Sequence, residues 1–174
     1  MLGTIKRTFN SRDANVIRLL YTTLVRPILD YSSTIWNPHQ MGVIRELENV
    51  QRRATKLIPS LQNLTYSERL QNLNLPSLSY HRNRMDLIMT YKILHEDVAV
   101  DKDYFFTMNS SHTRSNGLKI YKKYNRTTTR HFTFCQRIIN DWNSLPNDVV
   151  TSPNVLTFKS KLDNFLYNQR FSYI

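Results

Sequence analysis

The sequence predicts a mainly α-helical protein, an irregular helical bundle with one short strand or hairpin near residues 117–125. Apolar residues recur at helical spacing through most of the 174 residues, and only three glycines interrupt them. Hydrophobic residues make up 40% of the chain and aromatic residues 11%, which is enough to build a core and argues against general disorder. We therefore expect a folded protein made of packed helices.

The first helix is expected to begin near Ser11, a residue type that caps helices, and to bend or end at Pro27. One side of it should hold Val16, Leu19, Leu20, Thr23, Leu24, Ile28 and Tyr31. A second helix is expected over residues 41–58, with Glu48 on an outer face. Its apolar stripe should consist of Val43, Leu47, Val50, Ala54 and Leu57.

Two further helices are expected before residue 95. Thr65 and Glu68 have the spacing of a capping box, which should open a short helix through Leu73. Pro76 and Ser77 should start another helix that reaches about Leu94. Its buried face should hold Leu78, Met85, Leu87, Ile88, Tyr91 and Leu94.

The periodicity weakens over residues 96–116, which we interpret as a linker between a helical region over 1–95 and a basic helical region over 117–174. Alternation in the sequence GLKIYKKYN predicts the strand at 117–125. One helix is expected over 130–145, ended by Pro146, and a last helix should follow a Ser152 cap.

Charge gives the clearest functional signal. The chain carries 24 Lys and Arg against 13 Asp and Glu, which gives a net charge of +11. Such an excess favours polyanionic partners, above all nucleic acid and less often an acidic membrane surface.

One long stretch of the chain contains no acidic residue. Between Asp103 and Asp141 there are seven cations and no Asp or Glu. The cations are Arg114, Lys119, Lys122, Lys123, Arg126, Arg130 and Arg137, interleaved with Tyr121, Tyr124, Phe132 and Phe134. Such a stretch could pair phosphates with its cations and stack its rings on exposed bases. The alternative is a solvated surface with the aromatic residues buried beneath it.

No catalytic site, metal or cofactor is expected. A polymerase holds two divalent cations between paired carboxylates, and the nearest pairings here are Glu96 with Asp97 and Asp101 with Asp103. These lie in an expected loop, where a hydrated acidic turn is the simpler interpretation. His131 and Cys135 lie four residues apart on one expected helix, but two ligands fall short of the three or four that zinc takes.

The chain should be intracellular, in the nucleus or cytoplasm, and not in a membrane. Its single cysteine, Cys135, excludes an intramolecular disulfide and fits a reducing compartment. No stretch approaches the roughly 18 apolar residues of a membrane span, and residues 1–10 lack the apolar run of a signal peptide.

Several short motifs follow one another in a characteristic order. They are LVRPILDY at Leu24–Tyr31, Trp36-Asn37-Pro38, LENVQRRATK at Leu47–Lys56 and Trp142-Asn143-Ser144-Leu145-Pro146, with Arg82, Tyr91-Lys92-Ile93, Thr113-Arg114 and Phe158-Lys159 in their expected places. In this succession the chain resembles the segment after the polymerase core in reverse transcriptases of jockey-like non-LTR retrotransposons (LINE elements). The resemblance covers nearly the whole chain.

This resemblance implies a polymerase thumb in roughly the first third of the chain, followed by the C-terminal segment of the element. A thumb grips the backbone of the template-primer duplex, so Arg45, Arg52, Arg53 and Lys56 become candidate phosphate contacts for RNA, DNA or an RNA–DNA hybrid. The motif residues Trp36, Asn37, Pro38, Trp142, Asn143, Leu145 and Pro146 are expected to be structural, although residues 142–146 could also bind a partner.

The chain lacks the fingers, the palm with its metal-binding aspartates and the endonuclease of such elements, so we expect a non-catalytic fragment of a longer ancestor. A second hypothesis is a helical interaction module that docks on the missing polymerase core through apolar residues such as those near 1–9, without binding nucleic acid itself. A third, enzymatic hypothesis would depend on Asp101 and Asp103.

Overall fold

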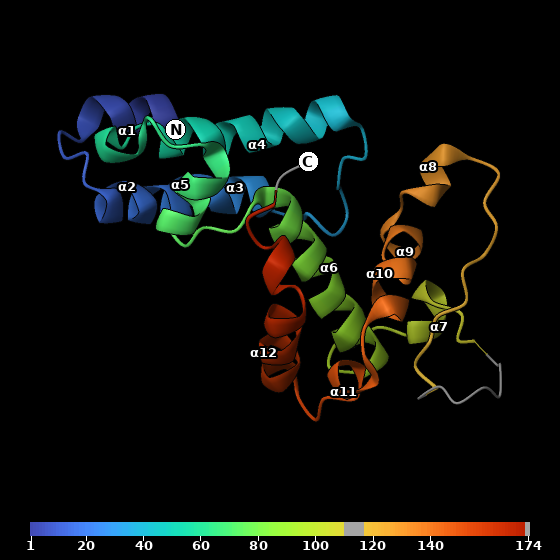
Figure 1. Cartoon of the computed structure of the whole chain (residues 1–174). Helices are drawn as coiled ribbons and strands as arrows, with labels where there is room; N and C mark the ends of the chain where they lie inside the picture. Colours follow the sequence, from blue (N-terminus) through green and yellow to red (C-terminus); the bar gives the residue numbers. More distant parts are fainter. Residues whose placement is uncertain (110–116, 173–174) are drawn as a thin grey trace. The chain divides into compact units, whose positions relative to one another are not determined.

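The computed structural model describes residues 1–109 and 117–172 and is mainly α-helical, as the sequence predicts (Figure 1). The chain forms two compact units. The first consists of Met1–Arg82 with the C-terminal residues from Asn168, and the second of Asn83–Tyr167. This division differs from the predicted one, because the boundary falls inside helix α6 (Leu78–Leu94) rather than in a linker over 96–116.

The first unit contains the elements up to the start of α6. They are α1 (Leu2–Thr8), α2 (Ala14–Leu20), the π-helix η1 (Tyr21–Val25), α3 (Arg26–Asp30), α4 (Met41–Thr55), the 3₁₀-helix η2 (Pro59–Leu61) and α5 (Tyr66–Asn72). Every one of these elements except α3 contributes at least one buried side chain to the core of the unit. Among these side chains are Ile5, Ile17, Tyr21, Ala54 and Leu70. The capping box predicted at Thr65 and Glu68 is present at the start of α5.

Helix α1 was not predicted from the sequence. Ile5 is only 3% exposed and belongs to the core, and Leu2 packs against this core, whereas Met1 (63%) and Phe9 (39%) are exposed. Arg12 closes the helix, because its guanidinium donates hydrogen bonds to the carbonyl oxygens of Lys6 and Phe9 at 2.6 and 2.7 Å. The cap of α2 is Asp13 and not Ser11: the Asp13 carboxylate accepts from Asn15 N–H at 2.8 Å.

Pro27 is accommodated by a π-helical turn rather than by a helix end. A proline has no N–H to donate, and its ring clashes with the carbonyl four residues earlier, so the preceding turn widens. The Arg26 N–H bonds to the Tyr21 carbonyl, five residues back. Thr22 and Thr23 donate their hydroxyls to the carbonyls of Arg18 and Leu19, at 2.9 and 2.8 Å.

The predicted buried side of this first helix is wrong. Ile17, Tyr21 and Val25 face the core, at 4% exposure or less. The residues expected there are largely exposed, including Leu19 (62%), Leu24 (41%), Ile28 (56%) and Tyr31 (77%). Apolar residues occur around most of this helix, so periodicity alone does not determine which side is buried. The side with Tyr21 faces the core because the Tyr21 hydroxyl reaches Gln51, a buried partner on α4.

The second unit is built around the rest of α6. Its other helices are α7 (Lys102–Phe105), α8 (Thr128–His131), α9 (Phe134–Arg137), α10 (Ile139–Ser144), α11 (Asn147–Val150) and α12 (Val155–Phe165); the 3₁₀-helix η3 (Tyr167–Gln169) follows them. Tyr91 stacks on Phe158 with ring centroids 4.3 Å apart, and Trp142 lies 6.0 Å from Phe158. The predicted buried side of α6 is correct except for Met85, which is 39% exposed.

Two other expectations for the second unit are wrong. The single helix over 130–145 is divided into α8, α9 and α10, because Thr133 adopts an extended conformation (φ −64°, ψ 153°) between the first two. The cap of α12 is Asn154, whose side chain accepts from Thr157 N–H, whereas Ser152 is buried and binds the carbonyl of Val149. Residues 96–109 are not a free linker either, since Phe106 is 2% exposed.

The strand predicted at 117–125 is reduced, within the described residues, to one antiparallel bridge between Met108 and Ile120. On the other side of Ile120 the backbone is paired by a side chain. Asn143 accepts from Ile120 N–H at 3.0 Å and donates to Ile120 C=O at 2.8 Å, while the Trp142 indole donates to the Leu118 carbonyl at 2.9 Å. The motif at 142–146 therefore contributes Trp142 and Leu145 to the core, with α10 ending at Ser144 and the exposed Pro146 preceding α11.

We predict that Asn143→Asp destabilises the protein by about 1–3 kcal/mol. An aspartate cannot donate to the Ile120 carbonyl, so two acceptors would face each other in a half-buried site. Denaturant unfolding followed by circular dichroism measures the change. The matched control is Asn140→Asp on the same helix, at an exposed position; equal stability losses in the two variants would contradict the pairing role of Asn143.

Candidate nucleic-acid interface

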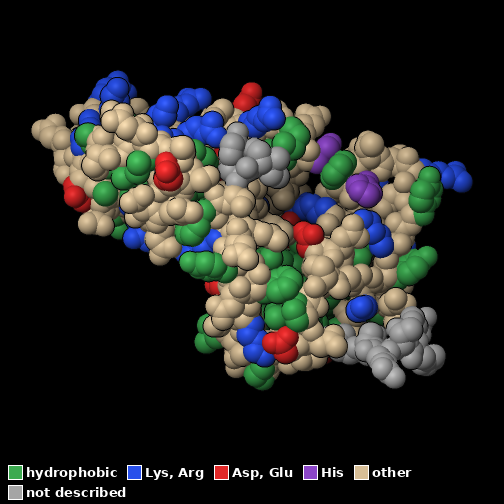
Figure 2. Space-filling model, in the orientation of Figure 1, with side chains coloured by type: hydrophobic (Ala, Val, Ile, Leu, Met, Phe, Trp, Pro, Cys, Tyr) green, Lys and Arg blue, Asp and Glu red, His purple; other side chains and the backbone are tan. Residues whose placement is uncertain are grey.

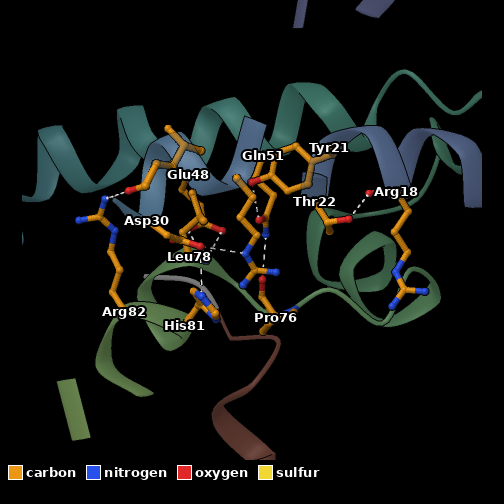
Figure 3. A network of polar contacts seen from close by, with 12 residues as sticks. Arg18, Tyr21, Thr22, Asp30, Glu48, Gln51, Pro76, Leu78, His81 and Arg82 are labelled. Carbon is orange, nitrogen blue, oxygen red and sulfur yellow. Dashed lines mark hydrogen bonds and ion pairs between the residues drawn. The ribbon is translucent and has the colours of Figure 1, made fainter. Parts of the chain in front are cut away.

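A buried polar network organises the first unit, and it includes Asp30, Glu48 and Gln51 from two of the sequence motifs (Figure 3). Helix α4 buries Glu48, Gln51 and Thr55, each at 1% exposure or less. The stripe predicted from apolar periodicity is therefore only partly correct: Ala54 is buried, but Val43 is 39% exposed and Glu48 lies inside rather than on an outer face.

Gln51 joins three other segments of the unit. Its carbonyl oxygen accepts from the Tyr21 hydroxyl at 2.8 Å, and its amide nitrogen donates to the Tyr66 hydroxyl at 3.2 Å and to the Pro76 carbonyl at 3.0 Å. A buried amide with all these partners carries no penalty for leaving water, and it fixes how η1, α5 and the start of α6 lie against α4.

Glu48 acts as a cap for another helix. Its carboxylate accepts from the Tyr66 hydroxyl and from the Leu78 N–H at 3.0 Å, at the first turn of α6. Burial raises the pKa of Glu48 above its ordinary value, although the hydrogen bonds from Tyr66 and the α6 backbone and the charge of Arg52 oppose this shift. A carboxylate at a helix N-terminus is stabilised by the free N–H groups and the helix dipole.

The second half of the LENVQRRATK motif, residues 52–56, is also partly buried. Thr55 accepts from Arg69 Nε at 3.1 Å, and Arg69 also donates to the Leu64 carbonyl at 3.0 Å. The guanidinium of Arg52 lies over the Tyr66 ring, 4.8 Å from its centroid. Arg52, a predicted phosphate contact, is therefore half-buried and engaged in a cation–π contact.

Asp30 of the LVRPILDY motif forms a second centre of charge. It accepts from Arg26 Nε at 3.3 Å and lies 3.1 Å from His81 Nε2. Burial alone would raise the pKa of Asp30, but the hydrogen bond from His81 and the charges of His81, Arg26 and Arg82 outweigh it and hold that pKa below its ordinary value.

Arg82 connects α6 to the Trp-Asn-Pro motif. It donates to the Leu29 carbonyl and, at 3.3 Å, to the Asn37 side chain, and its guanidinium lies 4.2 Å from the centroid of the Trp36 ring. A pocket of about 100 Å³ beside it is lined partly by Pro38, Glu48 and Arg82. These motif residues hold the first unit together.

The cations predicted on α4 differ in their exposure. Arg45, Arg53 and Lys56 are exposed, and Arg52 is the exception described above. Figure 2 shows Lys and Arg side chains gathered along the edge of the first unit where α1 and α4 lie. Sequence reasoning missed Lys6 and Arg7, which are exposed in the last turn of α1, because it did not predict that helix.

The acid-free stretch lies in the second unit, and most of its described cations are on the surface. Lys119, Lys123, Arg126 and Arg130 are exposed, and Lys122 is half-buried. Within residues 1–109 and 117–172, the side chains of these four exposed residues form no hydrogen bond or ion pair with the protein. Arg114 lies outside the described residues.

Arg137 must be removed from the set of predicted nucleic-acid contacts. Its Nε lies 2.9 Å from the carboxylate of Asp86, whose side chain is 2% exposed, and it also donates to the Phe132 carbonyl. The guanidinium is 5.8 Å from the centroid of the Phe134 ring. Arg137 is therefore a structural residue that compensates a buried charge.

Exposed apolar side chains are concentrated on α2, η1, α3 and the turn after them. They are Leu19, Leu24, Ile28, Tyr31, Ile35 and Trp36, with Ile35 at 83% exposure. We call this set the α2–α3 apolar surface. These residues follow one another closely along the chain, so their exposure is not scattered.

Short helices contain or adjoin the possible ligands noted in the sequence, Asp101, Asp103, His131 and Cys135. Asp101 caps α7 by accepting from the Asp103 N–H at 2.9 Å. His131 ends α8 and Cys135 lies in α9, so they do not share one helix as predicted. Burial raises the pKa of the Cys135 thiol, which keeps it protonated. In the described ranges, no three His, Cys, Asp or Glu side chains gather as metal ligands would.

Comparison with family models, with curated proteins and with solved structures gave no match for this chain. Among the helices that the structure describes, none has the length and apolarity needed to cross a membrane.

Tyr66→Phe should lower the free energy of unfolding by about 1–3 kcal/mol, because Glu48 and Gln51 each lose a buried hydrogen-bond partner. Denaturant unfolding provides the measurement. Tyr31→Phe is the matched control, since the Tyr31 side chain is 77% exposed. A stability of Tyr66→Phe equal to that of the control would show that the network does not stabilise the unit.

The lowered pKa of Asp30 has a definite consequence for pH dependence. Its ionised form stabilises the fold above the ordinary aspartate pKa of about 3.9, and this contribution is lost as pH falls through the lower pKa of the folded state. We expect Asp30→Asn to be less stable than the parent at pH 7, with a difference that narrows below about pH 4. Unfolding curves at several pH values measure the difference in stability between Asp30→Asn and the parent. A difference that stays constant from pH 7 to below pH 4 would contradict the lowered pKa of Asp30.

Proposed function

We propose that this chain is a non-catalytic nucleic-acid-binding segment of a retrotransposon reverse transcriptase, which grips RNA, DNA or an RNA–DNA hybrid by its phosphate backbone. One observation carries the proposal. Lys119, Lys123, Arg126 and Arg130 are exposed and have no ion-pair partner in the part of the chain that the structure describes.

In the same unit, the cations that have a structural role are paired with carboxylates. Arg137 is paired with Asp86, and Arg84 is paired with Asp163 through two hydrogen bonds. Self-repulsion among unpaired cations costs folding free energy, and a polyanion removes that cost when it binds. The uncompensated stretch is therefore the better candidate for contact with phosphates.

The exposed cations of α4 support the same function. Arg45, Arg53 and Lys56 project from a helix whose opposite side is held by the Glu48 and Gln51 network. In the family that the sequence resembles, this helix belongs to the thumb, which contacts the template-primer duplex. Contacts of this kind position a duplex without reading its bases, so little sequence preference is expected.

The α2–α3 apolar surface favours a second candidate function. An interaction module that docks on a polymerase core would need an exposed apolar surface, and Leu24, Ile28 and Ile35 provide one. In this alternative the chain would not bind nucleic acid by itself, and its charge would serve solubility or a protein partner.

Fluorescence anisotropy with single-stranded RNA, duplex DNA and an RNA–DNA hybrid, at low and physiological salt, tests the proposal. We expect affinity to fall steeply with salt, because bound phosphates release counterions. In Arg45→Gln/Arg53→Gln and in Lys119→Gln/Arg126→Gln, affinity should fall several-fold. The slope against log salt should become shallower by about 1.4 on single-stranded RNA if both cations contact phosphates.

The control is Ser160→Glu/Gln169→Glu, which lowers the net charge by the same amount at exposed positions outside both sets. An equal loss in the control would mean that only net charge matters. Unchanged affinity in both folded Gln variants would refute the assigned surfaces. Absence of binding to all three ligands, together with self-association that rises with concentration, would establish the docking module instead.

A further inference from the structure

The second unit contains a pocket of about 300 Å³ whose lining comes from three separate segments of the chain. The segments are residues 103–107, the extended stretch around Tyr121 and Lys123, and the α8–α9 region with Arg130 and Gln136. Its most buried lining residues are apolar, because Phe106, Ile120 and Ile139 are each 2% exposed or less. A pocket at the lower end of the size range for ligand sites suits one small molecule or one residue of a polymer.

The charged groups of this pocket define part of the ligand. Lys123 and Arg130 both line it, and neither forms an ion pair in the described ranges of the chain, so an anion is the complementary group. Asp103 lines it as well. A carboxylate repels a phosphate but accepts hydrogen bonds from a ribose hydroxyl or from the amino group of a base, which points to a ligand with both kinds of group.

Two exposed aromatic rings indicate what the remaining part of the ligand is. Tyr104 is 87% exposed and Tyr121 is 54% exposed, and both line the pocket. Among the described residues, neither ring is stacked on another aromatic side chain. Exposed aromatic rings beside cations are what single-stranded nucleic-acid sites use, because bases stack on the rings while the cations hold the backbone.

We propose that this pocket holds a single unpaired nucleotide, with its base on Tyr104 and its phosphate between Lys123 and Arg130. This inference extends the proposed function, because it adds a stacking site for an unpaired base to a surface that otherwise grips backbone. It assigns the single-stranded part of a nucleic acid to the second unit.

Calorimetric titration of the whole chain with AMP, UMP, adenosine and inorganic phosphate tests the inference. AMP and UMP should bind more tightly than adenosine or phosphate, because each of the latter offers only half of the complementary groups. In Tyr104→Ala, AMP affinity should fall at least about five-fold, as expected for the loss of one stacking ring. Arg130→Gln should weaken AMP and phosphate but leave adenosine unchanged.

Tyr124→Ala is the matched control. Tyr124 is 90% exposed in the same acid-free stretch but does not line the pocket, so AMP binding should stay at the parent level. Equal affinities for AMP and phosphate would reduce the pocket to an anion site. No AMP binding, or equal losses in Tyr104→Ala and Tyr124→Ala, would overturn the inference.

The outcome is separable from that of the proposed function. Lys119→Gln/Arg126→Gln removes two exposed cations that do not line the pocket, so it should bind AMP like the parent even where long strands bind less well. Binding of long strands without any AMP binding would reject the pocket alone. AMP binding without salt-dependent strand binding would reject the backbone grip and leave the nucleotide pocket in place.

Discussion

The side chains of Glu48 and Gln51 determine how the helices of the first unit meet. Both lie on the buried face of α4, and their partners come from η1, α5 and the segment that opens α6. An ionised carboxylate in such a place is tolerated only where hydrogen bonds replace its water, and here they come from a phenol and a helix N-terminus. Apolar contacts can slide, whereas these bonds have one geometry, so they specify a single arrangement.

This network also gives structural roles to polar residues of the sequence motifs. Residues such as Asp30, Gln51 and Arg82 have the types expected on a binding surface, yet they are engaged inside the unit. The sequence places Gln51, Arg52 and Arg53 side by side, and helical geometry separates them into a buried, a half-buried and an exposed residue. Fewer residues of this motif are therefore exposed for the proposed phosphate contacts than the motif contains.

Much of the fold followed from periodicity and caps, because these signals are local. The mainly helical class, the limits of α4 to within a few residues and the Thr65–Glu68 capping box were predicted correctly. What failed depended on distant partners. Burial of Glu48 requires Tyr66 and the α6 backbone, and burial of Tyr21 in η1 requires Gln51; neither can be inferred from the neighbouring residues.

The candidate site shows the same limit. The acid-free basic stretch was visible from composition, but removal of Arg137 from it required Asp86, which lies 51 residues away in the sequence. Tyr104 is the first residue of that stretch, far in sequence from Lys123 and Arg130, and the fold brings it to the pocket that these two cations line. Charge in a sequence predicts the kind of partner, and tertiary structure selects the residues that can meet it.

The pairing of Ile120 by Asn143 has a consequence for the solution behaviour of the chain. Residues 119 and 121 bond to Asn109 and Thr107 on one side of the extended stretch, and Asn143 occupies the backbone groups of Ile120 on the other. An exposed strand edge is a template on which a second molecule can add its own strand, and such addition leads to aggregation. A single amide side chain occupies this edge at Ile120, so the extended, aromatic-rich segment beside the pocket offers fewer free backbone groups for a second strand to pair with.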